Sequence, residues 1–233
     1  MTVSQPTASE EARRKGSVVL LRHGQTAWSL SGQHTGKTDI PLTQEGRIQA
    51  LEAGERLRQA FPAGFKPGFV YASPMGRAQE TARLAGFDQP IIWDDLAEWD
   101  YGRAEGRTRQ EISRLEGREW NLWRDGTEAL GSDLDGTWQD VLPSGERVTV
   151  RNGPGETLDQ VAARAGRLVA RLEPLVDQGC QVLLVGHAHI LRILTTQWLS
   201  LQAADARKLR LDTAHFGVLS RYKGDRVIER WNC

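Results

Sequence analysis

Cysteine is scarce in this sequence of 233 residues, which contains only Cys180 and Cys233. Neither lies in the spacing of a metal site, and two cysteines do not indicate a disulfide framework. Cys180 opens an apolar segment, which favours a reduced residue in the core, whereas Cys233 ends the sequence and is expected at the surface. The cysteines therefore indicate neither a disulfide-rich secreted domain nor a cysteine metal centre.

An excess of charge is also missing, because thirty Lys and Arg residues balance thirty Asp and Glu residues. Nothing then favours nucleic acid or an anionic membrane as a partner. No apolar run reaches transmembrane length, and the run at 18–21, although it follows basic residues, is too short for a signal peptide. We expect a cytoplasmic protein in which a few converging arginines build any anion site locally.

Apolar runs alternate with amphipathic stretches along most of the sequence. Strands are expected at 17–22, 69–72, 91–93 and 181–185, and helices at 43–60, 75–85, 157–178 and 188–199. In the helix at 43–60, the expected buried face consists of Ile48, Leu51, Leu57 and Phe61. A strand pair closes the sequence at 216–222 and 226–231. This order predicts an α/β fold, a three-layer sandwich with a mostly parallel central sheet flanked by helices.

Two regions stand apart from this alternation. Residues 1–15 are polar and predict a disordered N-terminal arm, which leaves 16–233 as a single domain. Residues 125–155 are rich in Gly, Asp, Ser and Pro and contain a hairpin signal around Pro143. We expect a small cap built from about 95 to 155.

Charged or histidine side chains follow three of the predicted strands. Arg22 and His23 come at the end of the first strand, Arg77 lies in the first turn of the helix capped by Ser73, and His187 follows the strand at 181–185. The carboxyl ends of parallel strands meet at one edge of a sheet. Two arginines and two histidines are therefore expected to converge there, near helix N-termini that favour anions.

This set of side chains is suited to a phosphoryl group. Guanidinium groups bind its oxygens through charge-assisted hydrogen bonds, one imidazole can attack phosphorus, and a second can stabilise the developing charge. The leaving alkoxide needs a proton, and Glu98, in an acidic and aromatic loop, is the best acid for it. That role would require a raised pKa beside Trp99 and Tyr101; the alternative is a solvated loop acid.

Other interpretations stay open at this point. His187 and His189 with His23 could be metal ligands, although no carboxylate cluster accompanies them and the arginines would repel a cation. A non-catalytic binding module is a second alternative. His34, in the long polar loop at 24–42, is interpreted as a surface histidine rather than a ligand.

Four motifs then resemble one family in order and spacing. They are Arg-His-Gly-Gln-Thr at 22–26, Ser-Pro-Met-Gly-Arg-Ala-Gln-Glu-Thr-Ala at 73–82, Leu-Ala-Glu-Trp-Asp-Tyr-Gly at 96–102 and Gly-His-Ala-His at 186–189. Together they resemble the histidine phosphatase superfamily, which includes the cofactor-dependent phosphoglycerate mutases. The resemblance covers about residues 17–222, apart from the insertion near 126–153.

The resemblance implies a role for each matching position. The implied catalytic set contains His23 as the phosphorylated histidine, Glu98 as the proton donor, and Arg22, Arg77 and His187 as the phosphate pocket. The implied substrate-binding set consists of Gln25, Thr26, Thr35, Gly36, Tyr101 and Arg192, the last at a position that could hold a second substrate phosphate. The family mechanism needs no metal or other cofactor: a histidine takes the phosphoryl group, and water or a second substrate then accepts it.

Local features are closest to the branch with sedoheptulose 1,7-bisphosphatase and bacterial acid phosphatases. Mutases carry Asn where Ser29 stands and use extra basic residues that this sequence does not offer at recognisable positions. We therefore predict a phosphatase for a small phosphorylated metabolite, a sugar phosphate or bisphosphate. The alternatives are a phosphoglycerate mutase and an inactive phospho-ligand-binding module. Two roles stay open for the insertion at 126–153: closure over the pocket and contacts in a homo-oligomer.

Overall fold

The computed structural model describes residues 16–233, so the arm predicted over 1–15 lies outside the described residues. One sheet has the strand order β3-β2-β6-β1-β7-β8. Its strands are β1 (Ser17–Arg22), β2 (Val70–Ala72), β3 (Ile91–Ile92), β6 (Gln181–Gly186), β7 (Phe216–Tyr222) and β8 (Asp225–Arg230). The first four in this order pair in parallel, and β7 and β8 add an antiparallel edge. The predicted mostly parallel sheet is confirmed.

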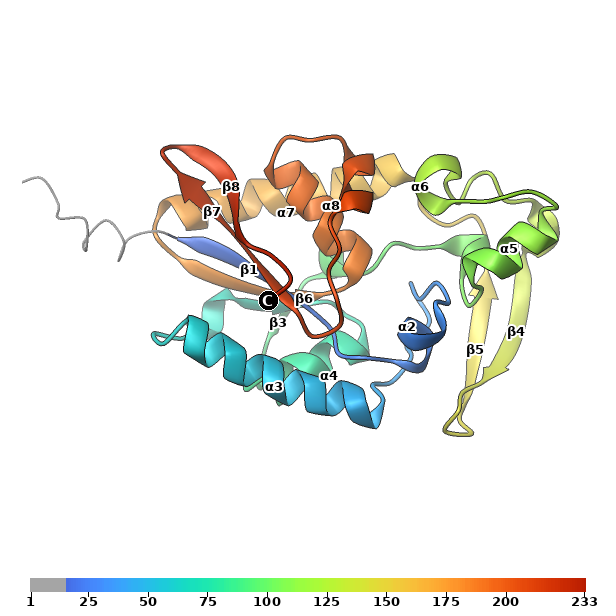
Figure 1. Cartoon of the computed structure of the whole chain (residues 1–233), viewed down its shortest axis with the longest axis horizontal. Helices are drawn as coiled ribbons and strands as arrows, with labels where there is room; N and C mark the ends of the chain where they lie inside the picture. Colours follow the sequence, from blue (N-terminus) through green and yellow to red (C-terminus); the bar gives the residue numbers. More distant parts are fainter. Residues whose placement is uncertain (1–15) are drawn as a thin grey trace, which may run out of the picture.

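Helices cover both faces of this sheet (Figure 1). Those of the main layers are α3 (Gln44–Ala60), α4 (Gly76–Leu84), α7 (Leu158–Asp177) and α8 (Ala188–Trp198). Alternate residues of β1 divide the core: Val18 and Leu20 belong to the cluster under α7 and α8, while Val19 and Leu21 belong to the cluster over α3 and α4. Period-two side-chain alternation in a strand buried on both sides produces this division. The three-layer α/β prediction is therefore confirmed.

The buried face of α3 differs from the expected one. Ile48 and Leu51 are 43% and 51% exposed, and the buried side is instead formed by small residues with Leu57. A Cβ on Gly54 would lie 2.6 Å from the carbonyl oxygen of Ala85. The backbones approach too closely for large side chains, so the small residues face inward and the expected set was wrong for these two positions.

Shorter elements occupy the rest of the chain. The helices are α2 (Ala27–Ser31), α5 (Arg109–Leu115) and α6 (Leu122–Asp125), and the 3₁₀ turns lie at Pro67–Phe69, Asp94–Leu96, Gly102–Ala104, Ser132–Leu134 and Ala203–Lys208. The hairpin expected around Pro143 is present as β4 (Gly136–Val141) and β5 (Arg147–Asn152). In Figure 1 it lies beside α5, at the opposite end of the molecule from β8.

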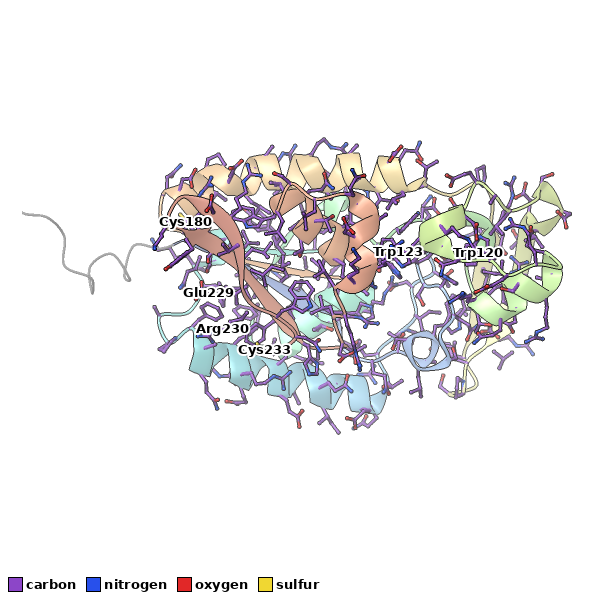
Figure 2. All side chains as sticks on the ribbon, turned by 45° about the horizontal axis from the view of Figure 1, so that its top comes forward. Trp120, Trp123, Cys180, Glu229, Arg230 and Cys233 are labelled. Atoms are coloured by element: carbon purple, nitrogen blue, oxygen red, sulfur yellow. The ribbon has the colours of Figure 1, made fainter. Side chains whose placement is uncertain are left out.

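Trp120 and Trp123, three positions apart, do not share a helix in the structure. Trp120 is fully buried and precedes α6, whereas Trp123 lies within that helix (Figure 2). Both cysteines are free thiols, and Cys233 is exposed as expected. Within residues 16–233, every helix is too short or too polar to cross a membrane.

Candidate functional site

His23 is the first residue after β1, and its side chain is only 5% exposed. Its backbone N–H donates to the carbonyl of Gly186 on the neighbouring strand β6. Its ring atom Nδ1 lies 2.7 Å from the carbonyl oxygen of Gly24. A carbonyl oxygen only accepts, so Nδ1 carries the proton and Nε2 keeps its lone pair. Burial first, and then the charges of Arg77 and Arg22, hold the pKa of His23 well below its usual value. The ring is therefore a neutral potential nucleophile.

His187 lies directly beside His23, as the pairing of β1 with β6 requires. The two ring centroids are 5.1 Å apart in an edge arrangement. His187 Nε2 lies 2.7 Å from the hydroxyl oxygen of Ser73, and its Nδ1 is buried without a hydrogen-bond partner. The sequence predicted Ser73 as the cap of the next helix. This prediction was wrong, because α4 begins later, with Met75 as its N-cap residue. An uncommitted buried ring nitrogen is available to a ligand atom.

Two arginines lie in the same site, and Arg77 is buried whereas Arg22 is half-buried. The guanidinium of Arg77 donates to the carbonyls of Thr38 and Gly36, both at 2.9 Å. That of Arg22 donates to the carbonyl of Leu211 at 2.8 Å. The Nε atom of each is buried without a hydrogen-bond partner. Burial lowers the pKa of both groups, yet arginine remains protonated in proteins. Two cations, each with a buried and unpaired Nε donor, favour an anionic ligand.

Glu98 is 6% exposed, which excludes the solvated loop acid considered from the sequence. Its carboxylate accepts hydrogen bonds from the backbone amides of His189 and Ile190 at the start of α8, both at 2.9 Å. Burial raises the pKa of Glu98, but His189, His187 and the backbone amide outweigh burial and hold this pKa well below the usual value. The structure therefore shifts the pKa of this carboxyl in the direction opposite to the one that an acid role requires.

Tyr101, which is buried, and His189, which is half-buried, form a pair beside Glu98. Tyr101 Oη lies 2.5 Å from His189 Nδ1. Burial raises the pKa of Tyr101 and lowers that of His189, while the Glu98 carboxylate acts on His189 in the opposite direction. His189 is thus engaged by Tyr101. Among residues 16–233, no group of three or more His, Cys, Asp or Glu residues is arranged to hold a metal ion.

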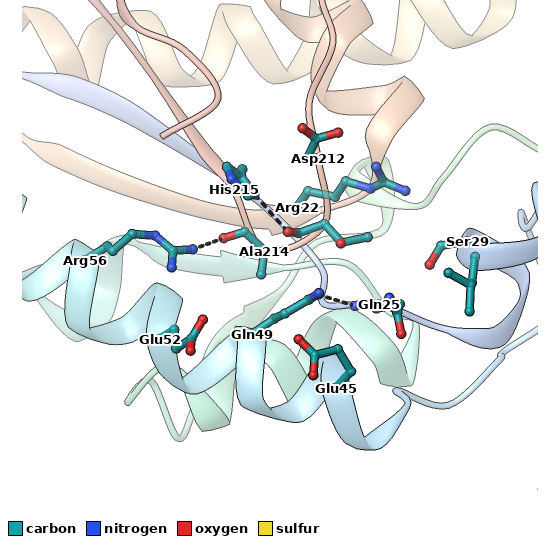
Figure 3. Close-up of a pocket in the computed structure, with 12 residues that line it drawn as sticks. Arg22, Gln25, Ser29, Glu45, Gln49, Glu52, Arg56, Asp212, Ala214 and His215 are labelled. Atoms are coloured by element: carbon teal, nitrogen blue, oxygen red, sulfur yellow. Dashed lines mark hydrogen bonds between the residues drawn. The ribbon is translucent and has the colours of Figure 1, made fainter.

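Arg22, His23, Glu98, Tyr101 and His189 meet at a pocket of about 190 Å³, and Arg77 and His187 are not among its lining residues. The residues that line it are Arg22, His23, Trp28, Ser29, Gly32, Gln33, His34, Thr35, Glu98, Tyr101, Ala188 and His189. A second hollow of about 470 Å³ shares Arg22 and Ser29 with this pocket and has Gln25, Gln49 and Asp212 in its wall (Figure 3). Arg22 is therefore part of the wall of both hollows.

His34 is a wall residue of the smaller pocket and not the surface histidine expected from the sequence. Its Nδ1 donates to the carbonyl of Arg107 at 2.7 Å, and its ring lies 5.0 Å from that of Tyr101. Burial lowers the pKa of His34 to about 4. The contacts come from residues more than sixty positions away, so no local signal in the sequence could have shown them.

The predicted substrate-binding positions have different surroundings. Thr35 lines the pocket, and Gln25 lines the neighbouring hollow. Thr26 is fully buried, and its hydroxyl accepts from Ser29 N as the N-cap of α2. The amide of Gly36 donates to the carboxylate of Glu105. Arg192 lies over the ring of Trp123, 5.1 Å from its centroid, and donates through Nε to the carbonyl of Ala206. Thr26 and Gly36 thus have structural partners within the chain.

Comparisons with known proteins give this geometry a family. The sequence model of the histidine phosphatase superfamily (branch 1) matches residues 18–141 and 132–233 of this chain. An acid phosphatase of Mycobacterium tuberculosis is 35% identical over 216 residues, which are 92% of this chain and 91% of that protein. A sedoheptulose 1,7-bisphosphatase of Saccharomyces cerevisiae is 31% identical over 207 residues, with 78% and 67% of the two chains covered.

The fold gives the same result. The solved structure of a Mycobacterium tuberculosis open reading frame has a TM-score of 0.76 and 32% identity, and the match covers 94% of this chain and 98% of that one. The chain belongs to the histidine phosphatase superfamily. It is a phosphatase of that superfamily, and the predicted enzyme class is confirmed.

Proposed function

We propose that this phosphatase removes the phosphoryl group from a sugar phosphate through a covalent intermediate on His23. One observation carries the proposal: Nδ1 of His23 is fixed by the Gly24 carbonyl, which leaves the Nε2 lone pair free beside Arg22 and His187. A neutral imidazole held in one tautomer is the state that nucleophilic attack on phosphorus requires. The uncommitted donors nearby can stabilise the negative charge on the phosphoryl oxygens.

Two chemical steps follow from this arrangement. In the first, His23 Nε2 forms a bond to phosphorus while the ester P–O bond breaks, and the leaving oxygen takes a proton from Glu98. In the second, a water oxygen bonds to phosphorus, gives a proton to the Glu98 carboxylate, and the N–P bond breaks to free phosphate and His23. Arg22, Arg77 and His187 hold the phosphoryl oxygens in both steps.

Glu98 must be protonated for the first step, although its pKa is low in the unliganded site. An arriving phosphate brings negative charge next to this carboxylate, and a like charge raises a carboxyl pKa. Entry of the substrate also removes water from the pocket, which acts in the same direction. We therefore propose that substrate binding itself brings Glu98 into its acid form.

The substrate class follows from the wall of the pocket. The side chains of His34, Ser29, Gln33 and Thr35 supply polar groups suited to sugar hydroxyls. Arg192 offers a second cation, since its charge is close enough to shift the pKa values of Tyr101 and Arg22. The yeast relative is a sugar bisphosphatase by name. We propose a sugar bisphosphate as the preferred substrate class, while the cytoplasmic location, the single domain and the cap over 95–155 stay predictions.

A trapped intermediate tests the mechanism. The enzyme is mixed with substrate, quenched without acid, and analysed by mass spectrometry for a phosphoryl adduct on His23. We expect the adduct in the wild type and none in His23→Ala, whose turnover should fall by about a thousandfold or more; His215→Gln, outside the smaller pocket, serves as the control. Full activity without an adduct would refute the covalent step.

A metabolite panel distinguishes the alternatives. Sugar bisphosphates, phosphoglycerates and an aryl phosphate are compared by phosphate release and by product analysis. Interconversion of phosphoglycerates faster than phosphate release would identify a mutase, and no turnover of any member would identify a binding module.

A further inference from the structure

The insertion predicted at 126–153 contains the β4–β5 hairpin, which packs on the loop at 26–42, here called the substrate loop. The two share a small core of their own. Trp28 and Ile40 from the loop are 1% and 0% exposed. The hairpin side chains that bury them are Leu142, Val148 and Val150. Among the described residues, this cluster contains no side chain from the central sheet, so the loop has its apolar anchorage on the hairpin.

Asp140 of β4 joins hairpin and loop by hydrogen bonds. Its Oδ2 accepts from Trp28 Nε1 at 2.9 Å and from Gln33 Nε2 at 3.2 Å. Both donors belong to residues that line the pocket. One carboxylate thus fixes two wall residues from behind, and hydrogen bonds to a charged acceptor are stronger than neutral ones.

A second connection runs from β5 to the loop through residues 102–106. Asn152 is 9% exposed, and its side-chain amide donates to the carbonyls of Gly102 and Glu105, both at 3.0 Å. The carboxylate of Glu105 in turn accepts from the amides of Gly36 and Thr38, both at 2.8 Å. The hairpin therefore supports both ends of the segment at 33–38.

The segment at 33–38 also binds the guanidinium of Arg77, one of the two arginines implied for the phosphate pocket. The carbonyls of Gly36 and Thr38 accept from Arg77, whose Nε is buried without a hydrogen-bond partner among the described residues. Arg77 is 1% exposed, so these carbonyls determine where its guanidinium lies. A displacement of about 1 Å at a positioning group can reduce a rate by about a hundredfold.

We infer that the β4–β5 hairpin is a positioning element for the substrate loop and that Asp140 is its positioning residue. Asp140 acts on catalysis through Trp28 and Gln33, and beyond them through the loop carbonyls that orient Arg77. The inference rests on the proposed function, because it assigns the loop and Arg77 to phosphate binding. This role for the insertion differs from the two that the sequence left open, which were closure over the pocket and contacts in a homo-oligomer.

The test compares Asp140→Ala with Gln139→Ala in the full chain. Gln139 is the neighbouring residue on the exposed face of β4 and serves as a matched control. For Asp140→Ala we expect kcat/KM to fall by about tenfold to a hundredfold, with faster hydrogen exchange in peptides covering 33–38 and unchanged exchange in peptides covering 17–22. Gln139→Ala should match the wild type in both measurements.

Two further variants keep the test decisive. Asp140→Asn preserves shape and one acceptor oxygen, so it should fold and recover part of kcat/KM if Asp140→Ala is unstable. Trp28→Phe removes one of the two donors, and the combined variant with Asp140→Ala should lose less than the product of the two single losses. If the loss of kcat/KM in the combined variant equals the product of the two single losses, Asp140 and Trp28 do not act through a shared contact.

The inference is overturned if Asp140→Ala lowers only Tm while kcat/KM and exchange at 33–38 stay at wild-type values. Failure of the proposed function would look different. The wild type would then release no phosphate, while the exchange comparison would still show whether Asp140 orders the loop.

Discussion

The Nε2 atom of His187 lies 2.7 Å from the hydroxyl oxygen of Ser73, and this hydrogen bond joins the ends of β6 and β2. The hydroxyl can donate to Nε2, which places the ring proton on Nδ1. Nδ1 is the buried atom without a partner in the chain. Ser73 thus prepares His187 to donate to a phosphoryl oxygen.

Replacing Ser73 by Ala should therefore impair catalysis more than folding. The variant loses one buried hydrogen bond, with a net contribution of about 1 kcal/mol, and the His187 ring is free to adopt the wrong tautomer. We expect kcat/KM to fall by about tenfold, with KM for an aryl phosphate nearly unchanged. Steady-state kinetics checks this, with Ser113→Ala as a matched control, because Ser113 is a half-buried residue of α5 whose hydroxyl accepts from the Trp120 amide outside the pocket. A wild-type kcat in Ser73→Ala would contradict the proposed role.

Replacing Glu98 by Gln should reveal its role as an acid through the leaving group. A sugar alkoxide needs a proton as it departs, whereas a nitrophenolate leaves without one. We expect kcat/KM to fall by about a hundredfold or more for a sugar phosphate and by far less for p-nitrophenyl phosphate. Equal losses for both substrates would mean that Glu98 acts through the position of α8 rather than as a proton donor.

Much of the site could be predicted because its signals are local. Arg22 and His23 stand at the end of one apolar run, and His187 stands at the end of another. Because the carboxyl ends of parallel strands meet at one edge of a sheet, these side chains were expected to lie together. The rings are indeed 5.1 Å apart. The family motifs cover these same segments, so residue pattern and resemblance point to the same atoms.

The sequence did not predict those features of the site that depend on contacts between residues far apart along the chain. Ser73 has the local pattern of a helix cap, but the hydrogen bond to His187, 114 positions away, occupies its hydroxyl. The pKa of Glu98 depends on His189, 91 positions away, and then on His187, which together outweigh the effect of burial. No pattern within a short window contains this information. The same holds for Asp140, whose partners lie in the substrate loop more than a hundred positions away.

Replacing Arg192 by Met should separate bisphosphate from monophosphate substrates. Met keeps much of the apolar contact with Trp123 but removes the charge. We expect KM for a sugar bisphosphate to rise by about tenfold or more, as the loss of one charged hydrogen bond implies, with little change for an aryl monophosphate. Arg207→Met, in an exposed 3₁₀ turn, is the control. Equal effects on both substrates would remove the second phosphate site.

His34 should make the stability of the protein dependent on pH. Burial lowers its pKa from 6.5 to about 4. Between these two values the unfolded chain binds a proton at this side chain that the folded chain excludes. The free energy of unfolding therefore rises with pH across this window. The contribution of His34 to it is fully developed above about pH 6.5 and is lost as the pH falls toward 4.

The variant His34→Gln removes this contribution and keeps the other buried histidines. His23, His187 and His189 also have lowered pKa values and act in the same direction in both proteins. Between pH 7 and pH 5 we expect the wild type to lose about 2 kcal/mol more than the variant, from the proton linkage of one such group. Urea unfolding at the two pH values measures this difference. An equal loss in both proteins would mean that His34 is solvated in solution and does not form a neutral part of the pocket wall.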